Sequence, residues 1–321
     1  MNWCKSVGRN GILWSYRSKV GLMKHKTKRP LSKRTRVLLL ALACAAALCM
    51  LWGFAVEPLQ LTVSEVEFAD SRLPKEMDGT RVVLLTDIHV GPFYSERDVE
   101  RVMDKVAELK ADMVLFGGDL MPKTSNYKQV DGERVSRALA GLKPRLGKYA
   151  VLGNHDIRTA DIQQTAISIL ESGGFQLLQN DAKKIGPGFY LCGTGSASDD
   201  GPGSPTDQAD VSKVAWTTEH NAFSLLLSHE PSQTDANAQY PFALQLSGHT
   251  HGGQISLPLI GPFLLYGHED YFAGFYTVGQ TRLYVSRGIG TSVVRARFLA
   301  PPEIVVVTLR KSPTPPEENT P

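Results

Sequence analysis

The chain has 321 residues, of which 42% are hydrophobic and 21% are charged, and this composition is that of an ordinary globular protein. Its formal net charge of +3 is misleading, because residues 1–36 contain eleven Lys and Arg and no Asp or Glu, which leaves 24 basic and 32 acidic side chains elsewhere. The body of the chain is therefore acidic, which gives no support to nucleic acid binding. With Cys192 as its single cysteine, the body cannot form an internal disulfide.

A charge-free apolar segment follows the basic tail. It is "VLLLALACAAALCMLWGFAV", Val37 to Val56, and its 20 residues match the length of a helix that crosses a bilayer. We predict a transmembrane anchor at 37–56, with a basic cytoplasmic tail at 1–36 and the rest of the chain outside the cytoplasm, because positive residues favour the cytoplasmic side. The chain would then be a single-pass protein of the cell membrane or inner membrane.

Two alternatives concern this N-terminal region. A cleaved signal peptide is the first, with Gly53 to Ala55 as a poor small-residue cleavage site. The second is a start at Met23, which would make residues 1–22 an artefact of the assigned start. A buried core helix is less consistent with the length of the apolar segment and with the basic cluster before it.

The next part of the chain predicts alternating strands and helices. Residues 57–79 form a linker and a first strand, because "LQLTVSEVEF" alternates, and "RVVLLTD" is a buried strand. Ser95 to Asp98 is a cap for a helix whose apolar residues recur from Val99 to Val106 at helical spacing. Further strands are predicted at 113–116 and 148–152, and further helices around 131–142 and 161–171. This order indicates an α/β fold with parallel strand pairs.

From about residue 175 the pattern becomes rich in strands. The segments are "FQLL", "GFYLCG", "FSLLLSH", "FALQLSGH", "TRLYVS" and "EIVVVTL", and they predict a second, mixed sheet packed against the first. The loop at 194–209 is rich in glycine but lacks the Gly-Lys-Ser/Thr ending of a phosphate-binding loop. Residues 311–321 read as a disordered tail.

Side chains that can bind metals stand where these apolar runs end. Asp87 and His89 are two positions apart and would share one face of a strand. Because the ends of strands in an α/β sheet converge at one edge, the whole set predicts a metal centre there. Any one of these residues alone has a structural explanation, such as a hydrogen-bonded histidine or a turn residue. The set continues with Asp119 in "GGDL", Asn154, His155 and Asp156 in "GNHD", His229 in "SHEP", and His249 and His251 in "SGHTHGG".

These motifs resemble, in order and in full, those of the calcineurin-like metallophosphoesterase superfamily, over residues 80–310. The phrases "SHEP" and "SGHTHGGQ" are similar to its membrane-anchored or exported, phosphodiesterase-like bacterial branch. The resemblance implies an α/β fold of two packed mixed β-sheets flanked by helices, a four-layer sandwich. The apolar segment at 37–56 would place one transmembrane helix before it.

The resemblance also implies a ligand set for two divalent metal ions. Imidazole and carboxylate ligands suit Mn²⁺, Zn²⁺ or Fe²⁺. Two such ions can clamp phosphate oxygens and lower the pKa of a water that attacks the phosphorus. Asp119 would bridge the ions, with Asp87, His89 and His251 completing one site and Asn154, His229 and His249 the other.

Two further residues would serve the chemistry rather than bind metal. By resemblance, His155 would stabilise charge on the phosphate or protonate the leaving group, and Asp156 would orient and charge its imidazole. Arg158 and Arg287 are candidates for contact with the phosphate, unless they are solvated surface residues.

The implied function is a membrane-tethered, dinuclear-metal phosphoesterase that acts on phosphodiester or pyrophosphate bonds, including lipid-linked ones. Pro122 stands where purple acid phosphatases have a metal-binding Tyr, and "GDLMPKTS" lacks the Asp-Arg-Gly clamp of protein Ser/Thr phosphatases, so both identities are disfavoured. One alternative is a UDP-2,3-diacylglucosamine pyrophosphatase of lipid A synthesis, although its substrate would lie at the cytoplasmic leaflet. A non-catalytic scaffold is the other alternative.

An unusually apolar segment, "SLPLIGPFLLYGHEDYFAGFY" at 256–276, follows the last metal-binding motif. It predicts either packed core or a hydrophobic lip, including Phe263 and Leu264, that docks on the bilayer or takes an acyl chain.

Overall fold

The computed structural model describes residues 31–122, 125–196, 209–215, 217–219, 221–257, 260–263, 270–292 and 294–313, together with the backbone of two short strands near the N-terminus. Most of the predicted basic tail, including Met23, lies outside the described residues. The same is true of most of the loop at 194–209, of Leu264, and of the end of the C-terminal tail. The chain divides into two compact units, residues 1–47 and 48–321.

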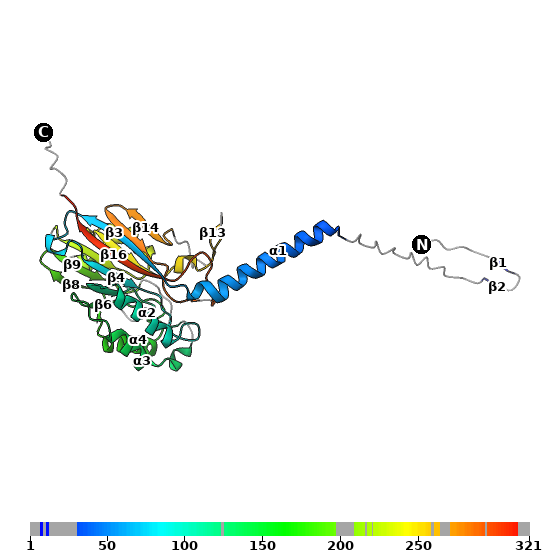
Figure 1. The fold of residues 1–321 in the computed structure, drawn as a ribbon, viewed down its shortest axis with the longest axis horizontal. Helices are drawn as coiled ribbons and strands as arrows, with labels where there is room; N and C mark the ends of the chain where they lie inside the picture. Colours follow the sequence, from blue (N-terminus) through cyan, green and yellow to red (C-terminus); the bar gives the residue numbers. More distant parts are fainter. Residues whose placement is uncertain are drawn as a thin grey trace, which may run out of the picture. The chain divides into compact units, whose positions relative to one another are not determined.

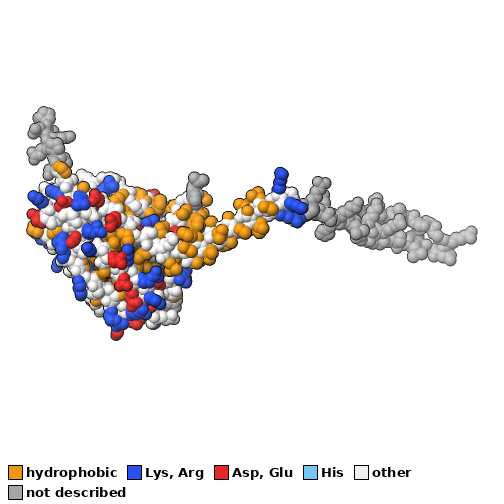
Figure 2. All heavy atoms as spheres, in the orientation of Figure 1, with side chains coloured by type: hydrophobic (Ala, Val, Ile, Leu, Met, Phe, Trp, Pro, Cys, Tyr) orange, Lys and Arg blue, Asp and Glu red, His pale blue; other side chains and the backbone are white. Residues whose placement is uncertain are grey.

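The N-terminal unit contains the start of a long apolar helix. Strands β1 (Val7–Gly8) and β2 (Gly11–Ile12) form a two-stranded antiparallel pair. Helix α1 (Lys33–Leu51) buries none of its side chains, and Figure 2 shows hydrophobic groups along it. One π-helical turn, Trp52–Val56, and one 3-10 turn, Glu57–Leu59, continue the helical path. By length and composition, the segment Lys33–Leu59 could cross a membrane.

Two six-stranded sheets form the second unit (Figure 1). In the first sheet, β4 to β7 are parallel, whereas β16 is antiparallel to β4 and parallel to β3. In sheet order its strands are β3 (Thr62–Asp70), β16 (Glu303–Lys311), β4 (Arg81–Leu85), β5 (Met113–Phe116), β6 (Lys148–Ala150) and β7 (Gln176–Leu177).

The second sheet is also mixed, which confirms the predicted fold class. Strands β15, β11, β10 and β9 are parallel, and an antiparallel strand lies at each edge. Its order is β14 (Gly274–Val278), β15 (Thr281–Val285), β11 (Leu244–Ser247), β10 (Phe223–Leu227), β9 (Phe189–Gly193) and β8 (Asp181–Gly186). A small hairpin, β12 (Ser256–Leu257) and β13 (Gly261–Pro262), stands apart from both sheets.

Two strands differ from the sequence-based prediction. The segments that form β7 and β16 were expected in the second sheet, but both belong to the first. Strand β16 belongs to the first sheet because it pairs with β4 along one of its edges and with β3 along the other. The local apolar pattern does not predict this pairing. A strand that is buried on both faces has a continuous apolar sequence in either sheet.

Helices cover the outer faces of the two sheets. Figure 1 shows α2 (Glu96–Glu108), α3 (Gly132–Ala140) and α4 (Ala160–Ser172) together beside the first sheet. The capping box predicted at Ser95 and Asp98 is present at the start of α2. Short helices α5 (Val211–Ala215) and α6 (Thr234–Asn237) belong to the second half of the chain, and 3-10 turns occur at Lys75–Met77, Ser125–Gln129, Pro231–Gln233 and His251–Gly253.

The buried strand β4 shows how the layers pack. Val83 and Leu85 belong to the core between the first sheet and helices α2 to α4. Val82 and Leu84 belong to the core between the two sheets, where Phe223 and Leu225 of β10 also lie. Because successive side chains of a strand point to opposite faces, a strand buried on both sides needs a continuous apolar run.

The apolar segment at 256–276 does not behave as one unit. Phe275 on β14 packs against the core between the sheets. Ile260 and Phe263 in the β12–β13 region are instead 74% and 66% exposed, so packed core is the wrong interpretation for these two residues.

The residues that leave α1 are built into the second unit. The Gly53 carbonyl accepts a hydrogen bond of 2.9 Å from the Arg297 amide. The buried Glu57 carboxylate accepts bonds from Trp52 Nε1 at 2.8 Å and from the Ala300 amide at 2.7 Å. The junction is therefore a packed part of the domain rather than a loose linker.

We expect Glu57→Ala to lower the free energy of unfolding by about 1–3 kcal/mol, because the buried Ala300 amide would lose its acceptor. Urea unfolding of the full chain in detergent micelles measures this change. The matched control is Glu67→Ala, since Glu67 forms an exposed ion pair with Arg310 whose loss should leave stability nearly unchanged. Equal losses in the two variants would contradict the packed junction.

Candidate metal centre

All the predicted site residues lie at the ends of strands from both sheets. Asp87 and His89 follow β4, and Asp119 follows β5. His229 follows β10 of the second sheet. The loops after β6 and β11 supply the others, Asn154, His155 and Asp156 from the first and His249 and His251 from the second. All are buried except His249, which is half-buried, so the fold brings dispersed motifs into one enclosed cluster.

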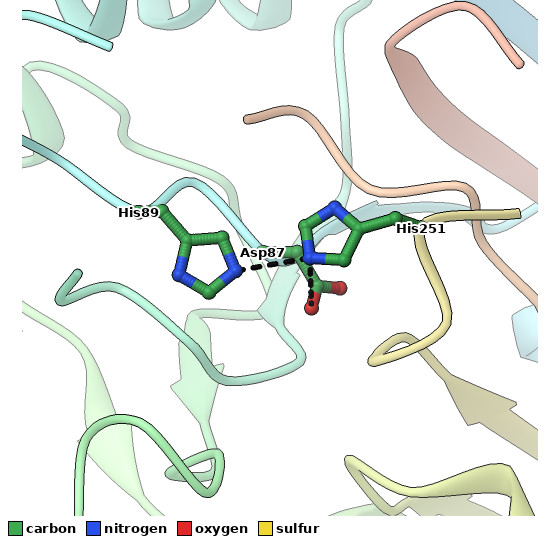
Figure 3. A group of neighbouring side chains, drawn as sticks. All are labelled: Asp87, His89 and His251. Atoms are coloured by element: carbon green, nitrogen blue, oxygen red, sulfur yellow. Dashed lines mark hydrogen bonds and ion pairs between the residues drawn. The ribbon is translucent and has the colours of Figure 1, made fainter. Parts of the chain in front are cut away.

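One group consists of Asp87, His89 and His251. Figure 3 shows their side-chain ends pointing toward one another. His251 Nε2 lies 3.0 Å from His89 Nε2 and 3.6 Å from Asp87 Oδ1. Two ligands that each lie about 2.1 Å from one ion are separated by about 3.0–3.4 Å, so these spacings suit ligands of a single cation.

A second group consists of Asn154, His229 and His249. Asn154 Oδ1 lies 3.2 Å from His229 Nε2 and 3.1 Å from His249 Nδ1. The two histidine nitrogens are 3.3 Å apart. The donor atoms of this group have the same close spacing as those of the first.

Asp119 lies between the two groups. Its Oδ2 atom is 3.6 Å from His89 Nε2 in the first group and 3.5 Å from His229 Nε2 in the second. The same oxygen is 4.0 Å from His155 Nε2. A single carboxylate oxygen therefore faces both groups, which is the position that a bridging ligand requires.

Backbone carbonyls hold two of the histidines in a defined orientation. His229 Nδ1 lies 2.7 Å from the Gly117 carbonyl, and His89 Nδ1 lies 3.1 Å from the Met121 carbonyl. A carbonyl oxygen can only accept, so each Nδ1 carries a proton, and the neutral form of each ring has its Nε2 lone pair toward the cluster. This is the tautomer that a metal-binding imidazole needs.

The cluster shifts the pKa values of its members. Burial alone would raise the pKa of Asp119, but the surrounding imidazoles, chiefly those of His155 and His229, hold it well below its usual range. Burial alone would lower the pKa of His229, but the Asp119 carboxylate raises it well above its usual value. Burial, with the neighbouring His89, lowers the pKa of His251 well below its usual value. Neighbouring charges outweigh burial at Asp119 and His229, whereas burial is the main cause of the shift at His251.

The backbone of the cluster is strained. Left-handed φ angles are unfavourable for residues with a Cβ, by about 1–2 kcal/mol each. Such strain persists where the surrounding structure enforces it, and it is typical of functional sites. Five of the predicted ligands adopt such angles: Asp87 (56°), His89 (50°), Asp119 (59°), His249 (71°) and His251 (51°).

Asp156 makes different contacts from those predicted. Its carboxylate was expected to orient His155, but it accepts hydrogen bonds from backbone amides, from Asp119 at 2.8 Å, Met121 at 2.9 Å and Gly153 at 3.1 Å. Burial, with the nearby Asp119 carboxylate, raises its pKa to about 7. Through these contacts Asp156 joins the loops that follow β5 and β6.

Arg297 is the largest fully buried side chain among the described residues, although no sequence pattern singled it out. Its guanidinium donates to the carbonyls of Arg287, Gly290 and Ala300, and Nη2 lies 3.4 Å from His251 Nδ1. Burial lowers its pKa to about 10. Carbonyl oxygens satisfy its donors, so Arg297 braces the segment behind His251.

The two arginines proposed as phosphate contacts differ in their surroundings. Arg287 Nη2 forms an ion pair of 3.1 Å with the buried carboxylate of Glu303, which also accepts from the Arg287 amide at 2.9 Å. These contacts with Glu303 give Arg287 a structural role. Arg158 is half-buried, two residues beyond Asp156.

Gly153 allows two of the loops to approach each other. A Cβ atom at this position would overlap the Asp119 carboxylate and lie 2.6 Å from the Asp119 amide. Glycine is needed at 153 for space, since any side chain would displace Asp119 from its position between the two groups.

We expect Gly153→Ala to lower the free energy of unfolding by about 1–3 kcal/mol through overpacking. It should also weaken Mn²⁺ or Zn²⁺ binding, measured by isothermal titration calorimetry, because Asp119 must move. Gly141→Ala is the matched control, since Gly141 is exposed at the end of α3 with an ordinary φ of −62°. Unchanged metal binding in Gly153→Ala would show that the observed position of Asp119 is not required for metal binding.

Comparison with known proteins agrees with this geometry. A family model for the calcineurin-like phosphoesterases matches residues 80–253. The chain is 33% identical over 271 residues to the uncharacterized metallophosphoesterase YkuE of Bacillus subtilis, covering 81% of this chain and 90% of that protein. It is 30% identical to the phosphodiesterase YaeI of Escherichia coli, covering 71% and 82% of the two chains. It is 25% identical to the UDP-2,3-diacylglucosamine pyrophosphatase LpxG of Chlamydia muridarum, covering 84% and 96%. With its motifs gathered in one cluster, the chain belongs to the calcineurin-like phosphoesterase family.

Proposed function

We propose that the chain is a membrane-tethered phosphoesterase that uses two divalent metal ions to hydrolyse phosphodiester or pyrophosphate bonds. The observation that carries this proposal is the position of Asp119 Oδ2, within 3.6 Å of a histidine in each of the two groups. Asp119 would be shared between the ions, with Asp87, His89 and His251 holding one and Asn154, His229 and His249 holding the other.

The residues present suit such a pair of ions. The donors are imidazole nitrogens, carboxylate oxygens and one amide oxygen, a mixture that favours Mn²⁺, Zn²⁺ or Fe²⁺ over Ca²⁺. The spacing between donor atoms and the tautomers fixed at His89 and His229 support the same assignment. When bound, the ions would supply Lewis-acid stabilisation of phosphate oxygens and activate water for attack.

His155 is the residue that we assign to proton transfer or charge stabilisation. Its ring centroid lies 4.6 Å from that of His89, and its Nε2 lies 4.0 Å from Asp119 Oδ2, so it adjoins the first group and the shared carboxylate. Its backbone amide donates to Asp119 Oδ1 at 2.9 Å, which fixes the residue relative to the shared carboxylate. A protonated imidazole there can donate to the leaving oxygen.

The proposal of a membrane tether rests on α1 and on the packed junction that follows it. Gly53 and Glu57 contact Arg297 and Ala300 within the domain, and cleavage near Gly53 to Ala55 would remove part of this packing. These contacts favour an uncleaved anchor over a signal peptide. The basic residues before α1 favour a domain on the extracytoplasmic side.

The similarity to LpxG supports a second candidate function, hydrolysis of the pyrophosphate bond of UDP-2,3-diacylglucosamine. Its substrate would lie at the cytoplasmic leaflet, whereas the charge distribution places the domain outside, so it remains the second candidate. A scaffold without catalytic activity is less consistent with a complete set of metal-competent residues gathered around one carboxylate.

We expect the full chain to hydrolyse bis(p-nitrophenyl) phosphate only with added Mn²⁺ or Zn²⁺, and EDTA to abolish the activity. Asp119→Asn should lose turnover together with metal binding. His155→Ala should keep its metals but lose about 10²–10⁴-fold in kcat, the usual contribution of a general acid. Asp104→Asn, at an exposed carboxylate on α2, is the matched control and should behave as the parent. Full activity of His155→Ala would show that His155 takes no part in catalysis.

A comparison of substrates separates the two candidate functions. We expect release of p-nitrophenol from the diester to exceed release of UMP from UDP-2,3-diacylglucosamine in detergent micelles, under the same metal conditions. The reverse order would favour the pyrophosphatase. No turnover of either compound by a folded protein with both metals bound would favour the scaffold.

A further inference from the structure

Three segments that are far apart in the sequence lie side by side where the chain leaves α1. The Gly53 carbonyl accepts from the Arg297 amide, which places Phe54 next to the segment 297–299. Phe298 in turn pairs with the start of the β12–β13 hairpin, because its amide donates to the Gln254 carbonyl at 3.0 Å and its carbonyl accepts from the Ser256 amide at 2.8 Å. Backbone hydrogen bonds therefore fix the three segments together.

Each of these segments exposes a large apolar side chain. The exposed fractions are 53% for Phe54, 55% for Leu299, 74% for Ile260 and 66% for Phe263. We call these four residues the apolar rim. Among the described residues beyond α1, the other large exposed apolar side chains are Trp52, Leu59, Phe93 and Phe272, and the first two lie on the same junction. Figure 2 shows hydrophobic side chains on the domain beside the residues that leave the helix.

We infer that the apolar rim docks into the interface of the bilayer that α1 crosses. The rim is continuous with the membrane segment, because Phe54 lies within the apolar span Lys33–Leu59 and is held against the domain through Gly53. Aromatic and aliphatic residues beside the end of a membrane helix belong at the depth of the lipid headgroups and the first acyl carbons. This inference rests on the tether in the proposed function, but not on catalysis.

Docking would also fix where the candidate metal centre lies. The hairpin region that carries Ile260 and Phe263 follows the turn His251–Gly253, with Gln254 and Ile255 between them. Gln254, between the two, is buried, and its side chain bonds to the carbonyl of Val294 at 2.6 Å and the amide of Ser292 at 3.1 Å, so this connection is rigid. A docked rim therefore holds His251 beside the membrane surface, where phosphate esters are carried by lipid headgroups.

Photochemical cross-linking tests the docking directly. The full chain, reconstituted in phosphatidylethanolamine and phosphatidylglycerol vesicles, would carry p-benzoylphenylalanine in place of Phe263 or of Leu299. We expect lipid adducts at both positions, detected as mass shifts of the peptides. The control position is Lys183, exposed on β8 at the opposite edge strand of the second sheet from β14, which should give none. Adducts to a second protein chain, or equal adducts at Lys183, would overturn the inference.

A second pair of variants tests the role of the rim itself. Ile260→Ser with Phe263→Ser should lower the lipid adduct at Leu299 by about tenfold, because two apolar groups leave the interface. Ile260→Leu with Phe263→Leu should retain it. Hydrolysis of bis(p-nitrophenyl) phosphate should be equal in both, since the rim is outside the centre. An undiminished adduct in the serine variant would overturn the inference.

Flotation of the vesicles separates this inference from the proposed function. Protein that floats with the vesicles but gives no lipid adduct at Phe263 or Leu299 has a tether without docking, which contradicts the rim. Protein that gives adducts but hydrolyses no ester contradicts the catalytic proposal alone. Protein that does not float contradicts the tether and the rim together.

Discussion

The carboxylate of Asp119 lies between two groups of metal-competent side chains, and the backbone determines its position. Its own amide is held by Asp156, its Oδ1 atom by the amide of His155, and its φ angle of 59° belongs to the left-handed region. The backbone also determines the positions of neighbouring side chains, since Asp87 and His89 adopt left-handed φ angles as well. Such a site stores strain and concentrates buried charge, which bound cations would offset. Metal binding and folding are therefore coupled in the proposed centre.

The end of the apolar helix and the candidate metal centre share one segment of chain. Glu57 binds the Ala300 amide, Arg297 binds the Ala300 carbonyl, and the Arg297 guanidinium lies 3.4 Å from His251. A buried arginine whose donors are spread over several carbonyls makes its surroundings stiff, because each bond lost would leave a buried polar group unsatisfied. The end of the apolar helix is thus part of the scaffold behind a proposed metal ligand. A shortened protein that lacks the residues up to Glu57 would lose part of that scaffold as well as the proposed tether.

The features that the sequence could predict are local ones. Continuous apolar runs predicted buried strands such as β4, and Ser95 with Asp98 predicted the start of α2. The polar residues at strand ends could be grouped because parallel strands end at one edge of a sheet. The structure brings all of them together.

The features that escaped prediction depend on contacts between distant residues. The sheet to which β16 belongs is decided by β3 and β4, which lie more than two hundred residues earlier. Arg297 resembles any surface arginine in the sequence, and only the carbonyls around it make its burial favourable. Asp156 stands next to His155 in the chain, yet its carboxylate turns to the backbone, because three amides there need an acceptor.

The position of β16 also has a consequence for how the protein is made. The strand lies between β3 and β4 in the first sheet, but its residues, Glu303–Lys311, come after the other described strands of both sheets in the sequence and are synthesised after them. Until they emerge, β3 lacks the strand with which it pairs and β4 has an open edge, so the nascent domain exposes unpaired strand edges. Completion of the first sheet must therefore wait until the second sheet has also been synthesised. If the proposed anchor holds the chain, this delay would keep an unfinished sheet beside the membrane until β16 is made, and chaperones or rapid closure must then prevent wrong pairing.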